Sequence, residues 1–139
     1  MCGYPSGGSS YRGVRSAIPV ERIVMGEVRL LAMGRVKDYK AAVDIMNRVS
    51  NVAAAVEGSV VWEAFADQDS GLFVLNEAFA SEEAFAEYEG AVDSSGLRPL
   101  VGEALEFERL ILLSTVENEH LNQVFDSMGG IRVTPVASK

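Results

Sequence analysis

The chain has 139 residues, the length of a single domain that can bury a self-sufficient core. Its 12 basic and 20 acidic residues give a net charge of -8, which would repel a polyanion, so we expect no nucleic acid partner. Cys2 is the one cysteine and excludes an intrachain disulfide, no apolar run is long enough to cross a bilayer, and residues 1–10 lack a secretory signal pattern. We therefore expect a cytoplasmic protein with no membrane partner.

Residues 1–19 are rich in Gly and Ser and show no apolar periodicity. Such a segment buries too little apolar surface to offset the entropy lost on ordering. We expect a tail here, or an arm that orders only against a partner. The folded domain is predicted to span residues 20–139.

Apolar periodicity predicts the first elements of that domain. Residues 22–36 alternate as in a long strand, and residues 38–58 show an apolar stripe at helical spacing, with Gly58 as the expected stop. Residues 59–71 then form a strand and a hairpin turn, and residues 72–80 form the returning strand.

A second helix is predicted after the hairpin. Ser81 is a suitable N-cap, because its hydroxyl can accept a backbone hydrogen bond, and the two glutamates after it favour a helix N-terminus. The expected apolar stripe of this helix consists of Ala84, Phe85, Tyr88 and Val92. Residues 94–105 look like a short helical connection that is interrupted by glycine and proline.

The last part of the chain repeats this pattern. Residues 107–114 form a fourth strand, and Ser114 and Glu117 have the spacing of a capping box for another helix. The expected apolar stripe of that helix consists of Leu121, Val124, Phe125 and Met128, and residues 131–136 form a final strand. The resulting order is β-α-β-β-α-β with an appended α-β from about residue 106. This is an α+β, ferredoxin-like arrangement.

Both faces of the predicted sheet are apolar, although the two helices of a ferredoxin-like fold cover only one face. In residues 72–79, for example, Leu72 and Val74 lie opposite Phe73 and Leu75. A second sheet from another copy of the chain would cover the remaining face, so we expect a homodimer.

Asn76 and Glu77 interrupt this apolar strand, and alternation places them on opposite faces. A buried carboxylate must be paired, hydrated or protonated. The leading interpretation pairs Glu77 with Arg29 or Arg35 in a structural salt bridge. The alternative turns Glu77 toward a cavity with a raised pKa, where it exchanges a proton with a bound phenol.

Two aromatic residues are further candidates for ligand contact. Trp62 is expected to fill the core, or alternatively to stack on a substrate, and Tyr88 is expected to pack inward with a hydrogen-bonded hydroxyl, or alternatively to hold a ligand oxygen. His120 lies beside its helical stripe and is expected at the surface. No Cys or His cluster accompanies it, so we expect no metal site.

The stretch EGSVVWEAFADQDSGLFVLNEAFASEEAFAEY resembles the antibiotic-biosynthesis-monooxygenase family of dimeric α/β-barrel proteins. The matching residues, in family order, are Gly58, Trp62, Gly71, Glu77, Glu83, Ala84 and Phe85. The resemblance covers about residues 28–105, and the β-α-β portion after it resembles extensions of some members.

The resemblance implies a dimer whose two sheets close into a barrel, and in some members the oxidation of an aromatic or quinol-type substrate without metal or flavin. We therefore expect no cofactor and a small apolar or aromatic ligand near Trp62, Asn76, Glu77 and Tyr88. Haem degradation is disfavoured, because Tyr88 stands where haem-degrading relatives need a histidine. Trp62 and Asn76 lie on different strands without the local motif of the family's Asn and Trp pair, so the catalytic residues stay unassigned. The alternative function is a non-catalytic dimer of the same fold that binds a ligand or a partner.

Overall fold

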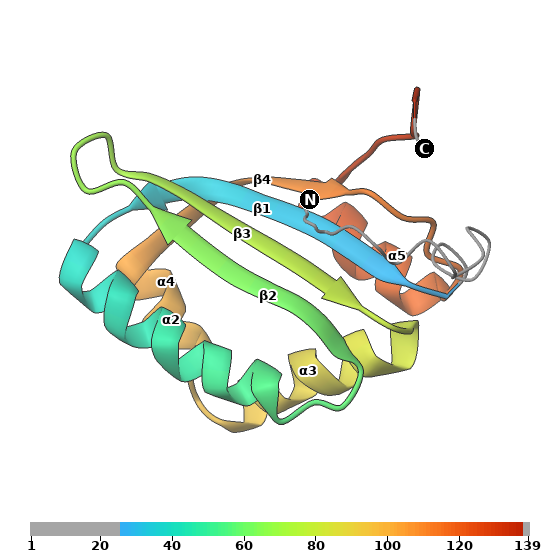
Figure 1. Cartoon of the computed structure of the whole chain (residues 1–139), viewed down its shortest axis with the longest axis horizontal. Helices are drawn as coiled ribbons and strands as arrows, with labels where there is room; N and C mark the ends of the chain where they lie inside the picture. Colours follow the sequence, from blue (N-terminus) through green and yellow to red (C-terminus); the bar gives the residue numbers. More distant parts are fainter. Residues whose placement is uncertain (1–25, 138–139) are drawn as a thin grey trace.

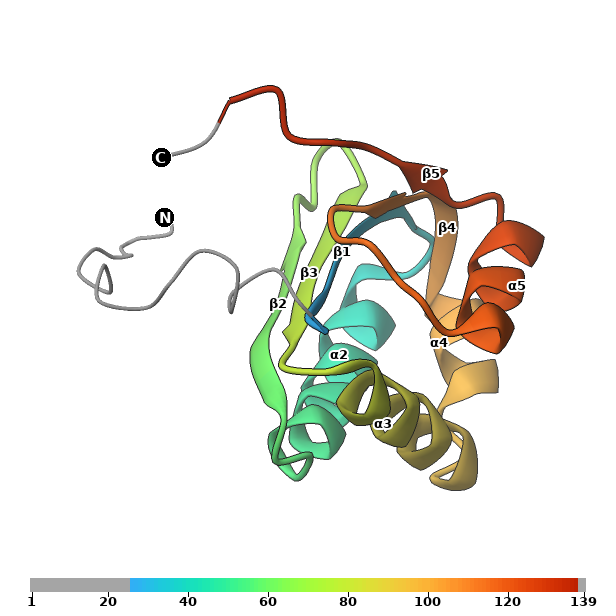
Figure 2. The same cartoon turned by 90° about the vertical axis from the view of Figure 1, so that its right-hand side faces the viewer.

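The computed structural model describes residues 26–137 as one sheet with its helices gathered on one face (Figure 1, Figure 2). The elements in chain order are β1 (Val28–Val36), α2 (Tyr39–Ala54), β2 (Ser59–Ala66), β3 (Leu72–Phe79), α3 (Glu82–Ser94), α4 (Arg98–Ala104), β4 (Leu105–Leu112), α5 (Glu119–Ser127) and β5 (Ile131–Arg132). The predicted tail, residues 1–19, and the first part of the predicted first strand lie outside the described residues.

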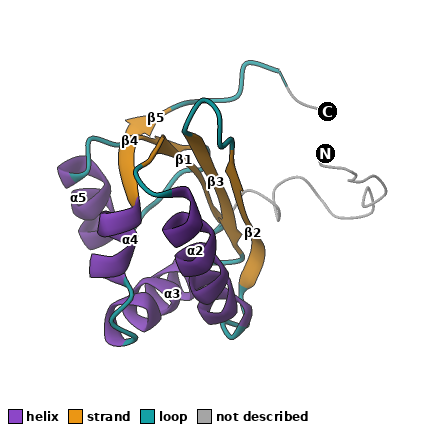
Figure 3. Cartoon of the chain, turned by 90° about the vertical axis from the view of Figure 1, so that its left-hand side faces the viewer, coloured by secondary structure: helices purple, strands orange, loops and turns teal. Residues whose placement is uncertain are grey.

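The strand order is β2-β3-β1-β4-β5. Neighbouring strands are antiparallel except for β4 and β5, which are parallel. The first four strands and the helices between them form the ferredoxin-like arrangement, and α5 with β5 extends it beside β4 (Figure 3). The predicted α+β fold class with an appended α-β is therefore confirmed, while the dimer stays a prediction.

The hydrophobic core lies between the sheet and the helices. The inward residues of β3 are buried, and so is the predicted stripe of α3, whose N-cap Ser81 accepts a hydrogen bond from Ala84 N at 3.1 Å as expected. Phe79 packs against Phe85 edge to face, with ring centroids 5.3 Å apart. This packing fixes α3 against β3, so a side chain on α3 has a defined position over the sheet.

The prediction that Gly58 ends the first helix is wrong. Helix α2 already ends at Ala54. A β-carbon at Gly58 would lie 2.4 Å from the β-carbon of Ala84, far closer than two carbon atoms can approach. Glycine is therefore required at position 58, because the connection between α2 and β2 lies in close contact with α3 there. This contact is tertiary, so the local sequence does not reveal it.

The predicted capping box before α5 is also wrong. Ser114 Oγ accepts a hydrogen bond from Arg29 N at 2.9 Å and so links the end of β4 to β1. Asn118 is the N-cap instead, with its side chain accepting from Leu121 N at 3.0 Å. Both oxygens of Glu82 accept backbone hydrogen bonds from residues 117 and 118, which anchors the start of α5 to α3.

The last strand is also shorter than predicted, since β5 holds two residues.

The sheet face away from the helices mixes apolar and charged side chains. Its partly or fully exposed apolar residues are Leu31, Met33, Val61, Phe65, Leu72, Val74 and Ile111. Arg29, Arg35 and Glu63 lie among them and are exposed. The two-faced apolar pattern expected from the sequence is present, and it is the basis of the dimer proposal below.

Candidate active site

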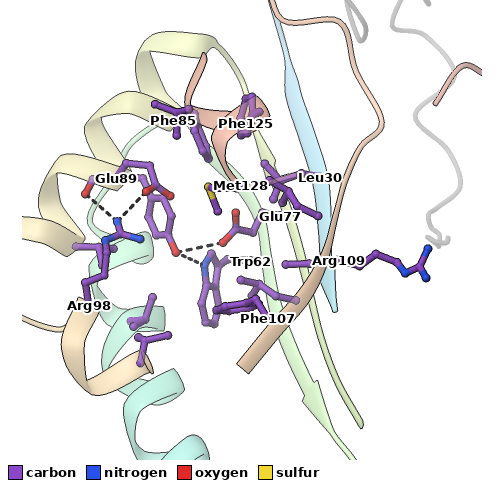
Figure 4. A pocket seen from close by; sticks show the side chains of 18 of the residues that line it. Leu30, Trp62, Glu77, Phe85, Glu89, Arg98, Phe107, Arg109, Phe125 and Met128 are labelled. Atoms are coloured by element: carbon purple, nitrogen blue, oxygen red, sulfur yellow. Dashed lines mark hydrogen bonds and ion pairs between the residues drawn. The ribbon is translucent and has the colours of Figure 1, made fainter. Parts of the chain in front are cut away.

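A cavity of about 160 Å³ lies between the helix-facing side of the sheet and helices α2 to α5 (Figure 4). Most of its lining is apolar, with Leu30 from β1, Leu75 from β3 and Phe125 from α5 among the residues that form its walls. The residues of the lining that carry polar groups are Trp62, Glu77, Tyr88, Glu89, Arg98, Glu108 and Arg109. Figure 4 shows that the Arg109 side chain points away from the others.

Glu77 is the buried carboxylate of this cavity. In the sheet register it lies between Leu30 of β1 and Trp62 of β2, and 4% of its surface is exposed. Its position on β3 continues the inward alternation of Phe73 and Leu75, so the strand geometry delivers the carboxylate to the helix side of the sheet. Figure 4 shows the carboxylate directed into the cavity.

A chain of hydrogen bonds connects three of the predicted site residues. Trp62 donates from Nε1 to the Tyr88 hydroxyl oxygen at 3.0 Å, and Tyr88 donates its hydroxyl proton to Glu77 Oε2 at 3.1 Å. The three residues belong to β2, α3 and β3, so the chain exists only because α3 packs across the hairpin. Within residues 26–137, Glu77 Oε1 has no hydrogen-bond partner and is left to face the cavity.

The pKa of Glu77 is raised to about 8, mainly by burial and then by the nearby charge of Glu89. The hydrogen bond from Tyr88, the indole N–H of Trp62 and the charge of Arg98 act in the opposite direction and lower it. The pKa of Tyr88 is also raised, because burial and the Glu77 charge both disfavour a phenolate. At neutral pH the carboxyl group is therefore mainly protonated and the phenol is neutral. A carboxyl group that titrates this close to neutrality can both take and return a proton.

An ion-pair cluster lies at the rim of the cavity. Arg98 donates from Nη2 to Glu89 Oε1 at 2.7 Å and from Nε to Asp93 Oδ1 at 2.5 Å. About half of the Arg98 side chain is exposed, so the cluster lies where the cavity meets solvent. Arg98 begins α4 and both acidic residues belong to α3, so the cluster also holds these two helices together.

Asn76, the fourth predicted site residue, is not part of this cavity. It lies on the opposite face of the sheet, where its amide donates to Glu63 Oε1 at 3.1 Å. The predicted salt bridge of Glu77 with Arg29 or Arg35 is wrong, because both arginines also lie on that opposite face and Arg35 pairs with Glu108 at 3.1 Å.

Sequence reasoning missed the contributions of α4 and α5 to the cavity. Arg98 was assigned to a connection, and Phe125 and Met128 to the stripe of an appended helix. Their spacing showed an apolar helix face but not the surface that the face covers. His120 is exposed in the first turn of α5 and does not line the cavity.

In residues 26–137, no group of three or more His, Cys, Asp and Glu side chains is arranged to hold a metal ion. Over the same part of the chain, every helix is too short or too polar to span a membrane.

Comparison with solved structures identifies the fold. MupZ from Pseudomonas fluorescens aligns with a TM-score of 0.68 at 7% identity, over 81% of this chain and 93% of that chain. SnoaB, a cofactor-independent oxygenase from Streptomyces nogalater, aligns with a TM-score of 0.56 at 14% identity, over 68% and 97%. A putative antibiotic biosynthesis monooxygenase from Caulobacter crescentus aligns with a TM-score of 0.55 at 20% identity, over 70% and 97%.

This chain has the antibiotic-biosynthesis-monooxygenase fold. The resemblance indicated by the sequence is therefore confirmed at the level of structure. No protein-family model and no curated protein sequence matches the chain. At these identities the structural likeness establishes the fold alone, and the activity of this protein has to be argued from its own site.

Proposed function

We propose that the protein binds a small hydroxylated aromatic molecule in the cavity and oxidises it as a cofactor-independent monooxygenase, with Glu77 as the group that moves the proton. The observation that carries this proposal is the hydrogen-bonded chain from Trp62 through Tyr88 to Glu77. It ends in a carboxyl group of raised pKa inside an apolar cavity. If Glu77 served stability alone, an apolar side chain at this position would cost less desolvation free energy on folding.

The size of the cavity supports a ligand with one aromatic ring. An apolar cavity of about 150 Å³ holds a benzene molecule, and the volume here is about 160 Å³. A quinol-type ring would bury its carbon face against the apolar walls. Its hydroxyl group would reach the free oxygen of Glu77.

The chemistry needs only the substrate and O₂. Ionised Glu77 takes the hydroxyl proton, and the resulting phenolate transfers one electron to O₂. The two radicals then join through a new carbon–oxygen bond at a ring carbon that bears hydrogen. The proton held by Glu77 returns to the peroxide, and loss of water leaves a carbonyl at that carbon. One oxygen atom stays in the product, the other leaves as water, and the substrate supplies the electrons.

The chain's own residues would act by binding and electrostatics. Tyr88 holds Glu77 in place, and its hydrogen bond lowers the pKa of Glu77, so that a minor fraction of the carboxyl groups is ionised at neutral pH. The apolar walls exclude water, which strengthens each electrostatic interaction inside the cavity. The cofactor-independent oxygenase named among the structures of this fold supports the assignment by analogy.

The alternative function is a non-catalytic ligand-binding or interaction dimer of the same fold. The observation that favours it is the small volume of the cavity, which leaves space for a ring and little space for O₂ beside it.

We also propose that the protein is a homodimer joined through the sheet faces that carry no helices. The support is the set of apolar side chains on that face, such as Leu31 and Val74 on the two central strands. Burying these groups against a second sheet would remove them from water.

Oxygen consumption with methylhydroquinone as the probe substrate tests the enzymatic proposal. The wild-type protein should consume O₂ above the background of the probe alone. Glu77→Gln should lower the rate by about 10²-fold or more, because the amide keeps the shape of the carboxyl group but cannot take the proton. Glu63→Gln makes the same change on the opposite face of the neighbouring strand and should leave the rate unchanged. Binding of the probe without protein-dependent O₂ uptake would select the non-catalytic alternative.

A further inference from the structure

Two side chains of the candidate site face a second cavity as well. Trp62 and Met46 line the inner cavity with Glu77, and they also line an outer cavity of about 340 Å³ between α2 and β2. The outer cavity is open to solvent. The two spaces therefore share one partition, made of a residue from β2 and a residue from α2.

The two cavities differ in chemistry. The inner cavity carries Glu77 and the Glu89–Arg98 ion pair, whereas every residue that lines the outer cavity is uncharged. The outer cavity has polar groups from Tyr39, Asn47 and Ser50, which lie along one side of α2. Asn47 uses its amide nitrogen to bind Val43 O at 2.9 Å, so its amide oxygen stays available as an acceptor. Such a surface accepts a neutral group that forms hydrogen bonds.

The partition has one fixed part and one movable part. The Trp62 ring is held by its 3.0 Å hydrogen bond to Tyr88. Met46 has an unbranched side chain with three rotatable bonds and no hydrogen bond to restrain it. A rotation of Met46 would connect the two cavities and leave the Trp62–Tyr88–Glu77 chain intact.

We propose that the two cavities form one bipartite binding site. The inner part holds the hydroxylated ring, and the outer part holds a neutral, hydrogen-bonding substituent of the same molecule, with Met46 moving aside between them. This inference rests on the proposed function of the inner cavity and deepens it. The ligand is then an aromatic ring with a side arm, such as an amide, and not a bare ring.

Calorimetric titration with two probes in the absence of O₂, which prevents turnover, tests this site. The first probe is methylhydroquinone, and the second is the same ring with a short neutral chain that ends in a primary amide. The amide probe should bind the wild-type protein about tenfold more tightly, the gain from one or two hydrogen bonds. Asn47→Leu should remove that gain and leave the first probe unaffected. Asn51→Leu makes the same change on an exposed residue of α2 outside both cavities and should alter neither affinity.

A second pair of variants tests the movable part of the partition. Met46→Ile has a stiff, β-branched side chain of similar volume and should weaken the amide probe several-fold relative to methylhydroquinone. Met46→Leu should keep the ratio of the two affinities. The bipartite site is wrong if the wild-type protein binds both probes with equal affinity, or if Asn47→Leu binds the amide probe as tightly as the wild type does. Either result would leave the proposed function of the inner cavity standing. If neither probe binds, the proposed function of the inner cavity fails as well.

Discussion

The Tyr88 hydroxyl donates to Glu77 Oε2 across 3.1 Å, and this contact joins a helix to the strand that it covers. It is the point at which the fold and the candidate chemistry depend on each other. The same bond lowers the pKa of Glu77, against the larger effect of burial that raises it to about 8. The strength of this one contact therefore affects both stability and proton affinity, which makes it accessible to experiment.

The first prediction concerns stability and pH. Glu77 has a pKa of about 8 in the folded protein and an ordinary value of 4.5, so its stabilising contribution is complete below about pH 4.5 and is lost as pH rises through about 8. The free energy of unfolding of the wild type should fall by up to about 1.4 kcal/mol per pH unit in this window, relative to Glu77→Gln. Urea unfolding of both proteins between pH 5 and 9 measures the difference. The prediction is wrong if the free energies of unfolding of the two proteins change with pH in the same way.

The second prediction concerns the pH dependence of turnover. If ionised Glu77 is the base, the protein-dependent rate of O₂ uptake should rise with pH and level off above about 8. Tyr88→Phe removes a hydrogen bond that lowers this pKa, so the rise should move to higher pH. Uncatalysed oxidation of the probe is subtracted at each pH. An identical profile in Tyr88→Phe would exclude Tyr88 as the positioning residue of Glu77.

The third prediction uses Trp62, which is the one tryptophan of the chain and lies two hydrogen bonds from Glu77. Its fluorescence should change with a midpoint near pH 8 as the carboxyl group ionises. The change should be absent in Glu77→Gln and present in Glu63→Gln. A transition that survives in Glu77→Gln would assign it to another group.

The fourth prediction compares two glycines. Gly58→Ala places a β-carbon 2.4 Å from that of Ala84 and should destabilise the fold by roughly 1–3 kcal/mol. Gly90→Ala lies within α3, where a β-carbon meets nothing within 4 Å, and should stabilise by about 0.5–1 kcal/mol through helix propensity. Thermal or urea unfolding of both variants measures the two changes in the free energy of unfolding, which should have opposite signs. A neutral Gly58→Ala would show that α3 can move away from the connection.

The fifth prediction is the oligomeric state. Sedimentation equilibrium at micromolar concentration should give about twice the chain mass of 14.9 kDa. Val74→Glu places a charge in the middle of the helix-free sheet face and should shift the mass to that of one chain. Glu87→Gln, on the exposed side of α3, should leave the dimer intact. A compact monomer of the wild type would refute the sheet-to-sheet dimer.

Much of the architecture follows from local patterns in the sequence. Alternation alone put Glu77 and Asn76 on opposite faces, and helical spacing alone put Tyr88 on the inward stripe of α3. Ser81 was recognisable as an N-cap, because capping involves residues within one turn. These features depend on the geometry of a few consecutive residues, so one sequence is sufficient to predict them.

Tertiary structure decided which of these residues meet. Alternation does not predict which residue of another element contacts Glu77. Because α3 packs over the hairpin, the hydrogen-bond partner of Glu77 is Tyr88, and not Arg29 or Arg35. The same holds for Gly58, whose role depends on Ala84 of α3, and for Met128, which is 57% exposed yet lines the cavity. The physical reason is that periodicity fixes the direction of a side chain within its own element. The contacts of that side chain depend on how separate elements pack.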